Sequence, residues 1–340
     1  MQVLFDPLQF DHEPRFFLVN GTKTENPEVA ERARMLLRAL QQEGHSVKNS
    51  GNHGLGPVAA VHSPDYLKFL KNIYRRWQHI DGGSEEVIPN IHPNLSPGGY
   101  PDSAVGQAGW HMADTACPVG PDTWKSALAS ANTAVDAAIH LLTEGQTVYA
   151  LCRPPGHHAF SSMAGGFCYL NNTAISAQQL RNGFERVAVI DVDLHHGNGT
   201  QEIFYQRADV LTVSIHADPV RFYPFFWGYA DGHGKGLGSG RNLNFPLPRG
   251  TGDKTYLENL ARAVELIRLY DPQALVVALG LDAYEGDPLA GLRITTTGFR
   301  RIGATIGKLK LPCVLVQEGG YLCDALGENL ISFLDGFENA

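Results

Sequence analysis

The sequence has few features of a membrane or secreted protein. No run of about 18 apolar residues occurs in it, so we expect no transmembrane helix. Its first residues, MQVLFDPLQFDHEP, contain no basic segment followed by an apolar one, so we expect no signal peptide. The cysteines are few and lack close metal-ligand spacing, which favours reduced thiols in a cytoplasmic protein: Cys117, Cys152, Cys168, Cys313 and Cys323.

Positive charge is also scarce. Lysine and arginine together number 27 against 35 aspartate and glutamate residues, which gives a net charge of −8. This balance argues against nucleic acid as a partner and favours a small cationic substrate. The chain has 340 residues, of which 43% are hydrophobic, so it can bury a sizeable core.

Apolar segments alternate with amphipathic ones through most of the chain. We expect strands at 1–5, 147–152, 187–192, 211–215, 274–281 and 313–317, with helices between most of them. This alternation predicts an α/β protein with a parallel sheet covered by helices on both faces. No repeat or linker interrupts it, so we expect a single domain over 1–340. Two long segments, about 79–121 and 216–249, are expected to be active-site loops.

Side chains suited to metal binding and acid–base chemistry follow five of the expected strands. They are His157 and His158 after the strand at 147–152, Asp193 and His195 after 187–192, His216 after 211–215, Asp282 after 274–281 and Tyr321 after 313–317. In open α/β sheets, ligands bind beyond the carboxyl ends of the strands. We therefore expect these side chains to form one site.

Three of these residues form a candidate metal site. Asp193 and His195 are two residues apart, so on an extended strand their side chains point the same way. With Asp282 they give two carboxylates and one imidazole, which leave a fourth position open as in catalytic zinc sites. The structural alternatives are a turn at the strand end for the first pair and a helix N-cap for Asp282.

The remaining polar residues suggest acid–base catalysis. We interpret His157 and His158 as an acid/base pair, and Tyr321 as a hydroxyl donor to an oxyanion or, alternatively, a packed aromatic. Asp191 would either orient a histidine, with His157 the best placed, or bind a second cation with backbone carbonyls. Asn198 would orient any histidine that it touches without adding charge.

Six segments in order resemble the zinc-dependent histone deacetylase superfamily: RPPGHHA, GGFCYLNN, DVDLHHGNGTQEIFY, SIHADP, GLDAYEGDPL and QEGGY. The resemblance covers the chain from about Leu55 onward. The stretch that begins HADPVRFYPFFWG is most similar to the bacterial acetylpolyamine amidohydrolases of that superfamily.

The resemblance implies an arginase/deacetylase fold with an eight-stranded parallel sheet. It implies Zn²⁺ on Asp193, His195 and Asp282, a site that would also accept Fe²⁺ or Co²⁺. It also implies a structural K⁺ bound by Asp191, Asp193, His195 and Ser214, largely through backbone carbonyls. The substrate channel would be lined by Phe167, Tyr223 and Leu289.

The expected activity is therefore removal of acetyl groups from acetylated polyamines or short diamines, with acetate and the free amine as products. The alternatives are deacetylation of acetyl-lysine in proteins or peptides, a ureohydrolase with two metal ions, and a non-catalytic relative. Phe17 and Leu289 stand where the polyamine branch has glutamates, although Glu13 lies near Phe17 in sequence and the long loop at about 79–121 keeps Asp102 and Asp114. We expect a homodimer or a higher homo-oligomer.

Overall fold

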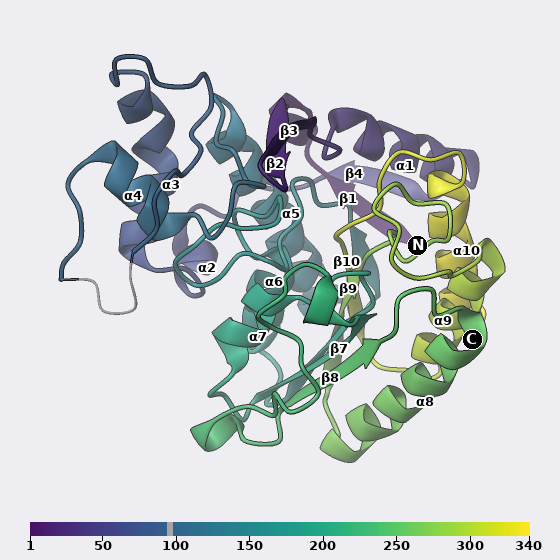
Figure 1. Ribbon diagram of the computed structural model, residues 1–340. Coiled ribbons are helices and arrows are strands. Elements are labelled where there is room, and N and C mark those ends of the chain that lie inside the picture. Colours follow the sequence, from purple (N-terminus) through teal and green to yellow (C-terminus); the bar gives the residue numbers. More distant parts are fainter. Residues whose placement is uncertain (94–97) are drawn as a thin grey trace.

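The computed structural model describes residues 1–93 and 98–340. Its centre is a sheet of eight parallel strands: β1 Gln2–Phe5, β4 Ser46–Asn49, β5 Val148–Ala150, β6 Val187–Asp191, β7 Val210–Ala217, β8 Asn242–Leu247, β9 Ala274–Leu279 and β10 Cys313–Gln317. Their order across the sheet is β4-β1-β5-β10-β9-β6-β7-β8 (Figure 1). The predicted eight-stranded parallel sheet is confirmed.

Helices cover both faces of this sheet (Figure 1). One face packs on α1 Ala30–Gln42, α8 Asp253–Tyr270, α9 Thr296–Gly307 and α10 Leu326–Glu338. The other face packs on α5 Thr123–Glu144, α6 Asn172–Leu180 and α7 Asn198–Phe204. Consecutive strand residues serve opposite faces, as Ile190 does for the first group and Val189 for the second. The central strands are therefore apolar throughout, which is typical of parallel sheets.

A third apolar cluster lies beside the sheet and involves α2 Gly56–Ala59, α3 Pro64–Trp77 and α4 Ala104–His111. Ser63 begins α3 by accepting a hydrogen bond from the backbone N–H of Tyr66, and Pro64 fills the first helical position. In Figure 1 these three helices group on the far side of α5 from the C-terminal helices.

Both segments expected to be loops contain regular structure. The range 79–121 includes α4, and its residues 94–97 lie outside the described part of the chain. The range 216–249 includes the last residues of β7 and all of β8, with short 3-10 turns at Pro219–Arg221 and Gly236–Gly238. The N-terminal segment between β1 and α1, for which no strand was predicted, contains an antiparallel hairpin, β2 Phe16–Val19 and β3 Thr22–Glu25. These elements were missed because they are short and polar or rich in glycine.

Across residues 1–93 and 98–340, none of the helices is both long and apolar enough to cross a membrane. All five cysteines are free in the structure, and only Cys323 is partly exposed to solvent.

Candidate active site

The three candidate metal ligands meet at the carboxyl ends of β6 and β9. Asp193, His195 and Asp282 are buried, and each offers a ligand atom that lies within 4.8 Å of the others. Because β6 ends at Asp191, the first two residues lie in the following turn and not on a strand. The carboxylate of Asp193 accepts a hydrogen bond from the backbone N–H of His195 at 2.8 Å, so a local turn, and not strand alternation, brings the pair together.

This donor set suits a divalent cation. Two buried carboxylates repel each other unless a positive charge lies between them. His195 Nδ1 lies 3.0 Å from Asp282 Oδ2 and 3.3 Å from Asp193 Oδ1. Burial opposes protonation of His195, but the hydrogen bonds to Asp193 and Asp282 outweigh it and raise the pKa of this imidazole to about 9. The cluster thus favours a positive charge at the position that a metal ion would occupy.

Gly319, after β10, completes the floor of this cluster. Its backbone N–H donates to Asp193 Oδ2 at 2.8 Å. A Cβ atom at this position would collide with the Oδ2 atoms of both Asp282 and Asp193. Only glycine therefore allows the backbone to approach both carboxylates.

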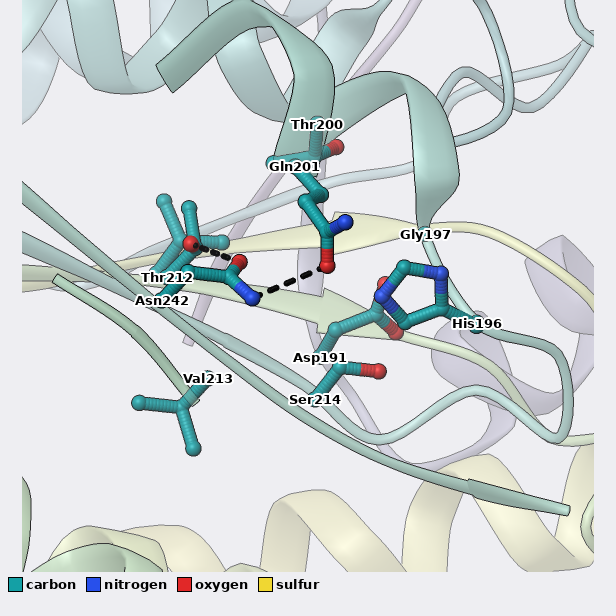
Figure 2. A pocket seen from close by; sticks show the side chains of 10 residues that line it. Asp191, His196, Gly197, Thr200, Gln201, Thr212, Val213, Ser214 and Asn242 are labelled. Carbon is teal, nitrogen blue, oxygen red and sulfur yellow. Dashed lines mark hydrogen bonds between the residues drawn. The ribbon is translucent and has the colours of Figure 1, made fainter. Parts of the chain in front are cut away.

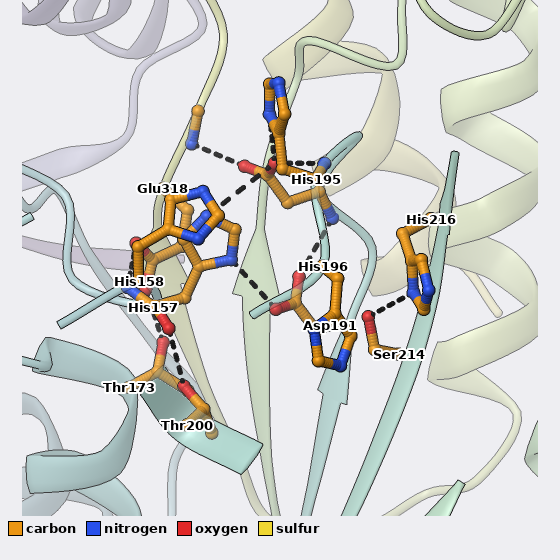
Figure 3. Close-up of polar contacts among 12 residues, drawn as sticks. His157, His158, Thr173, Asp191, His195, His196, Thr200, Ser214, His216 and Glu318 are labelled. Carbon is orange, nitrogen blue, oxygen red and sulfur yellow. Dashed lines mark hydrogen bonds and ion pairs between the residues drawn. The ribbon is translucent and has the colours of Figure 1, made fainter. Parts of the chain in front are cut away.

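The two adjacent histidines have different partners. His157 Nδ1 donates to Asp191 Oδ2 at 2.9 Å, a contact drawn in Figure 3. His158 Nδ1 donates to the neutral Asn198 Oδ1 at 2.7 Å. The structure thus assigns the two predicted orienting residues to one histidine each.

Their electrostatic environments differ accordingly. Burial lowers the pKa of His157, but the charges of Asp193 and Asp191 outweigh burial and raise it to about 10. Burial, together with the neighbouring His157 and His195, lowers the pKa of His158 well below its usual value. One imidazole is therefore held charged and the other neutral, an arrangement suited to an electrostatic partner beside a general base.

A cavity of about 660 Å³ leads to these groups, and it is lined by His158, His195 and Tyr321 among other residues. The predicted channel residues Phe167, Tyr223 and Leu289 all line it. The ring of Tyr223 stands edge-on to His158, with centroids 4.9 Å apart. Phe222, which was not predicted, stacks on His195 at 5.1 Å with an interplanar angle of 7°.

The ring of Tyr321 is buried and contacts one aromatic and one cationic side chain. Its ring meets Phe167 edge-on at 5.8 Å, and the guanidinium carbon of Arg32 lies 4.7 Å from its ring centroid. Burial raises the pKa of the Tyr321 hydroxyl well above its usual value, so the hydroxyl keeps its proton and remains a donor.

The acidic residues near the channel are few. Asp114 lines the cavity, where it accepts a hydrogen bond from the Tyr223 hydroxyl at 2.7 Å. Asp102 and Glu13 are exposed and are not among the cavity-lining residues. Phe17 lines the cavity and packs edge-on against Phe167 at 5.4 Å. The cavity lining is therefore rich in aromatic side chains and, within the described residues, contains one carboxylate, that of Asp114.

The residues predicted to hold a monovalent cation do not all share one cavity. Asp191 and Ser214 line a small cavity of about 10 Å³ between the sheet and α7, together with His196, Gln201, Thr212 and Asn242 (Figure 2). Asp193 and His195 are not among its lining residues. The Ser214 hydroxyl pairs with His216 Nδ1 at 2.8 Å (Figure 3).

Glu318 is a buried residue of this site that the sequence did not single out. Its carboxylate accepts hydrogen bonds from the backbone N–H groups of Gly156 and His157 at 2.6 and 3.0 Å, and from the Thr173 hydroxyl at 2.6 Å. It lies close to His157 and Cys168, but these hydrogen bonds already occupy the carboxylate. Glu318 therefore fixes the turn that carries the two histidines. A charged residue directly after an apolar strand was the available signal.

Arg32 and Arg153 also escaped the sequence reasoning. Both are buried and pair with the carboxylate of Glu28, at 2.6 Å for Arg32 Nη1 and 3.0 Å for Arg153 Nε. Arg32 also donates to the backbone carbonyls of Glu318 and Gly320, on either side of the glycine that faces the metal ligands. This network ties α1 to the turn before Tyr321.

Comparison with known proteins places this geometry among enzymes. The model of the histone deacetylase domain family matches residues 26–337. The chain is 45% identical to the acetylpolyamine amidohydrolase of Burkholderia pseudomallei, over 99% of this chain and 98% of that protein. It is 41% identical to acetylpolyamine amidohydrolase 2 of Pseudomonas aeruginosa, over 96% of each. A crystal structure of the Burkholderia pseudomallei acetylpolyamine aminohydrolase superposes with a TM-score of 0.95 at 44% identity, covering 99% of this chain and 98% of that one.

Proposed function

The chain belongs to the histone deacetylase domain family, and on that premise we propose that it hydrolyses the amide bond of small acetylated diamines or polyamines. The products would be acetate and the free amine. The observation that carries this proposal is that His158, His195 and Tyr321 line one aromatic-walled cavity beside two buried carboxylates.

We propose Zn²⁺ as the metal ion, held by Asp193, His195 and Asp282, with Fe²⁺ or Co²⁺ as acceptable substitutes. When bound, such an ion supplies Lewis-acid polarisation of the acetyl oxygen and acidifies water. The cluster of two carboxylates around one imidazole supports this assignment, because it favours positive charge.

His158 is the general base and acid in this proposal. Its imidazole is neutral and lines the cavity, so it can take a proton from the attacking water. Because Nδ1 of His158 donates to Asn198, Nε2 is the nitrogen that takes the proton. Nε2 then returns that proton to the leaving amine, which departs as the C–N bond breaks. His157, whose ring centroid lies 4.0 Å from that of His158, stays charged and stabilises the negative charge that develops.

Tyr321 donates its hydroxyl proton as a hydrogen bond to the oxyanion that forms from the acetyl carbonyl. The raised pKa of this hydroxyl keeps it protonated at neutral pH. The guanidinium group of Arg32 lies over the Tyr321 ring, and its positive charge favours the negative charge that develops on the oxyanion.

The substrate class follows from the cavity and from the relatives. The aromatic walls, Phe17, Phe167 and Tyr223, suit a slender alkyl chain. Asp114 supplies one carboxylate near the mouth, where a single distal ammonium group would lie. Relatives named acetylpolyamine amidohydrolases support amines over protein side chains as substrates.

We also propose a structural K⁺ close to Asp191 and Ser214, which face each other in the register of β6 and β7. The five free thiols support a reducing compartment such as the cytoplasm.

The decisive experiment is a comparison of kcat/KM for N-acetylputrescine, N-acetylcadaverine, N8-acetylspermidine and an acetyl-lysine peptide, with the purified zinc-loaded protein. We expect the acetylated amines to lead. A peptide that is better by tenfold or more would overturn the substrate assignment, and no acetate from any of the four would overturn the reaction. The Tyr321→Phe variant serves as the matched inactive control.

A further inference from the structure

Asp287 connects two parts of the proposed active site through a single carboxylate. It lies in the segment between β9 and α9 and is 4% exposed. Its Oδ2 atom accepts a hydrogen bond from the backbone N–H of Tyr321 at 2.9 Å. Its Oδ1 atom accepts one from the backbone N–H of Leu289 at 2.8 Å. The catalytic tyrosine and a channel-lining residue are therefore both held by the same side chain.

The Asp287 carboxylate makes no direct ion pair within the described part of the chain. Burial, followed by the charge of Asp282, raises the pKa of Asp287 to about 7. A buried carboxyl group without an ion-pair partner is costly unless hydrogen bonds compensate it. Its two backbone hydrogen bonds are the compensation that the fold provides.

Side chains from several parts of the chain bind the backbone groups of the turn before Tyr321. Gln317 Nε2 donates to the Gly319 carbonyl at 2.7 Å, and Arg32 donates to the Gly320 carbonyl. Gly320 has a φ of +116°, a backbone conformation that favours glycine. The next backbone N–H, that of Tyr321, donates to Asp287.

We propose that Asp287 is a positioning residue that keeps the Tyr321 hydroxyl in register with the substrate channel. The carboxylate lies in the segment that follows β9 and holds the backbone N–H of Tyr321. The same carboxylate holds the backbone N–H of Leu289, which lines the channel. A displacement of Leu289 is therefore transmitted to Tyr321 through the two hydrogen bonds of Asp287. This inference rests on the proposed function, because Tyr321 must act on the substrate for its position to affect the rate.

The test is a double-mutant cycle between Asp287 and Tyr321. Asp287→Asn preserves the shape of the side chain but replaces one acceptor oxygen with an N–H₂ group that cannot accept from a backbone N–H. Small misplacements of catalytic groups cost up to about 100-fold in rate. We expect kcat for N-acetylputrescine to fall about 10- to 100-fold with little change in KM. In the Tyr321→Phe background, the same change should lower kcat by less than about threefold.

Controls separate positioning from general damage. Asp324→Asn, three residues after Tyr321 and exposed, should leave kcat unchanged. Asp287→Ser is measured in parallel, with zinc content and thermal unfolding recorded for every variant. Equal losses of kcat in the two backgrounds, or no loss in either, would overturn the proposal. If both Asp287 variants fail to fold or to bind zinc, Asp287 serves stability only, which also overturns it. Failure of the proposed function is distinct, because it appears as inactivity of the wild-type protein.

Discussion

His158 donates a hydrogen bond from Nδ1 to Oδ1 of Asn198 at 2.7 Å, and this acceptor carries no charge. Its neighbour His157 instead faces the carboxylate of Asp191 at 2.9 Å. The pair is thus asymmetric: the partner of His157 stabilises an imidazolium, whereas the partner of His158 only orients a neutral ring.

Asn198→Asp should therefore change the pH dependence of catalysis. A carboxylate at this position favours the protonated form and raises the pKa of His158. Since the base must be neutral to accept a proton, the acidic limb of the kcat/KM profile should move to higher pH, by about one unit. The profile is measured from pH 5.5 to 9, with exposed Asn182→Asp as the control. An unchanged acidic limb would contradict the role of His158 as the base.

Tyr321→Phe should lose most turnover and keep the fold. Removal of one oxyanion donor typically lowers the rate by about 10²–10³. The ring contacts with Phe167 and Arg32 remain in the variant, so zinc content and the unfolding temperature should stay near those of wild type. The measurements are kcat with N-acetylputrescine, bound zinc and thermal unfolding. Activity within threefold of wild type would rule out the donor role.

Chelation should abolish activity, and added zinc should restore it. Removal of the ion leaves the buried carboxylates of Asp193 and Asp282 close together, so the unfolding temperature should fall as well. Metal analysis of the reloaded protein is expected to give about one zinc per chain. Two ions per chain would instead support a ureohydrolase type of site.

Glu28→Gln should destabilise the protein strongly. The carboxylate of Glu28 is fully buried and pairs with both Arg32 and Arg153. Loss of one member of a buried ion pair costs about 3–5 kcal/mol, because the remaining charges are left uncompensated. Glu31→Gln, at an exposed pair with Arg38, should cost less than about 1 kcal/mol. Urea unfolding of both variants tests this, and equal effects would contradict it.

His62 should make the fold less stable in mild acid. Its Nε2 atom accepts a hydrogen bond from the backbone N–H of Asn171 at 2.9 Å, and burial lowers the pKa of His62 to about 4. A folded-state pKa below the unfolded value means that stability is lost as the pH falls from about 6.5 toward 4.

Between pH 7 and pH 5 this residue should remove about 2 kcal/mol from the free energy of unfolding. His62→Gln keeps an acceptor but does not titrate, so its stability should depend less on pH by that amount. Urea unfolding of both proteins at the two pH values provides the comparison, and parallel pH dependences would contradict the assignment.

The sequence by itself determined the central architecture and the chemical identity of the site. Strands β6, β9 and β10 are buried on both faces, so each appears as an apolar run whose end is marked by Asp193, Asp282 or Tyr321. The strands at the sheet edges do not appear as apolar runs in the sequence. Strands β4 and β8 each pair with one neighbour only and carry polar residues such as Lys48 and Asn242, so their hydrogen bonding is not encoded in hydrophobic pattern.

Most of the pairings between distant side chains were decided by the tertiary structure. The sequence predicted His157 as the partner of Asp191, which the structure confirms, whereas the partner of Asn198 was left open and only the folded chain shows it to be His158. The residues that support Tyr321 are also distant in sequence, since Arg32 lies 289 residues before it and Asp287 lies 34 residues before it. Local sequence patterns report the period of an element and the face it buries. They carry no information on which distant side chains meet when the strand ends converge.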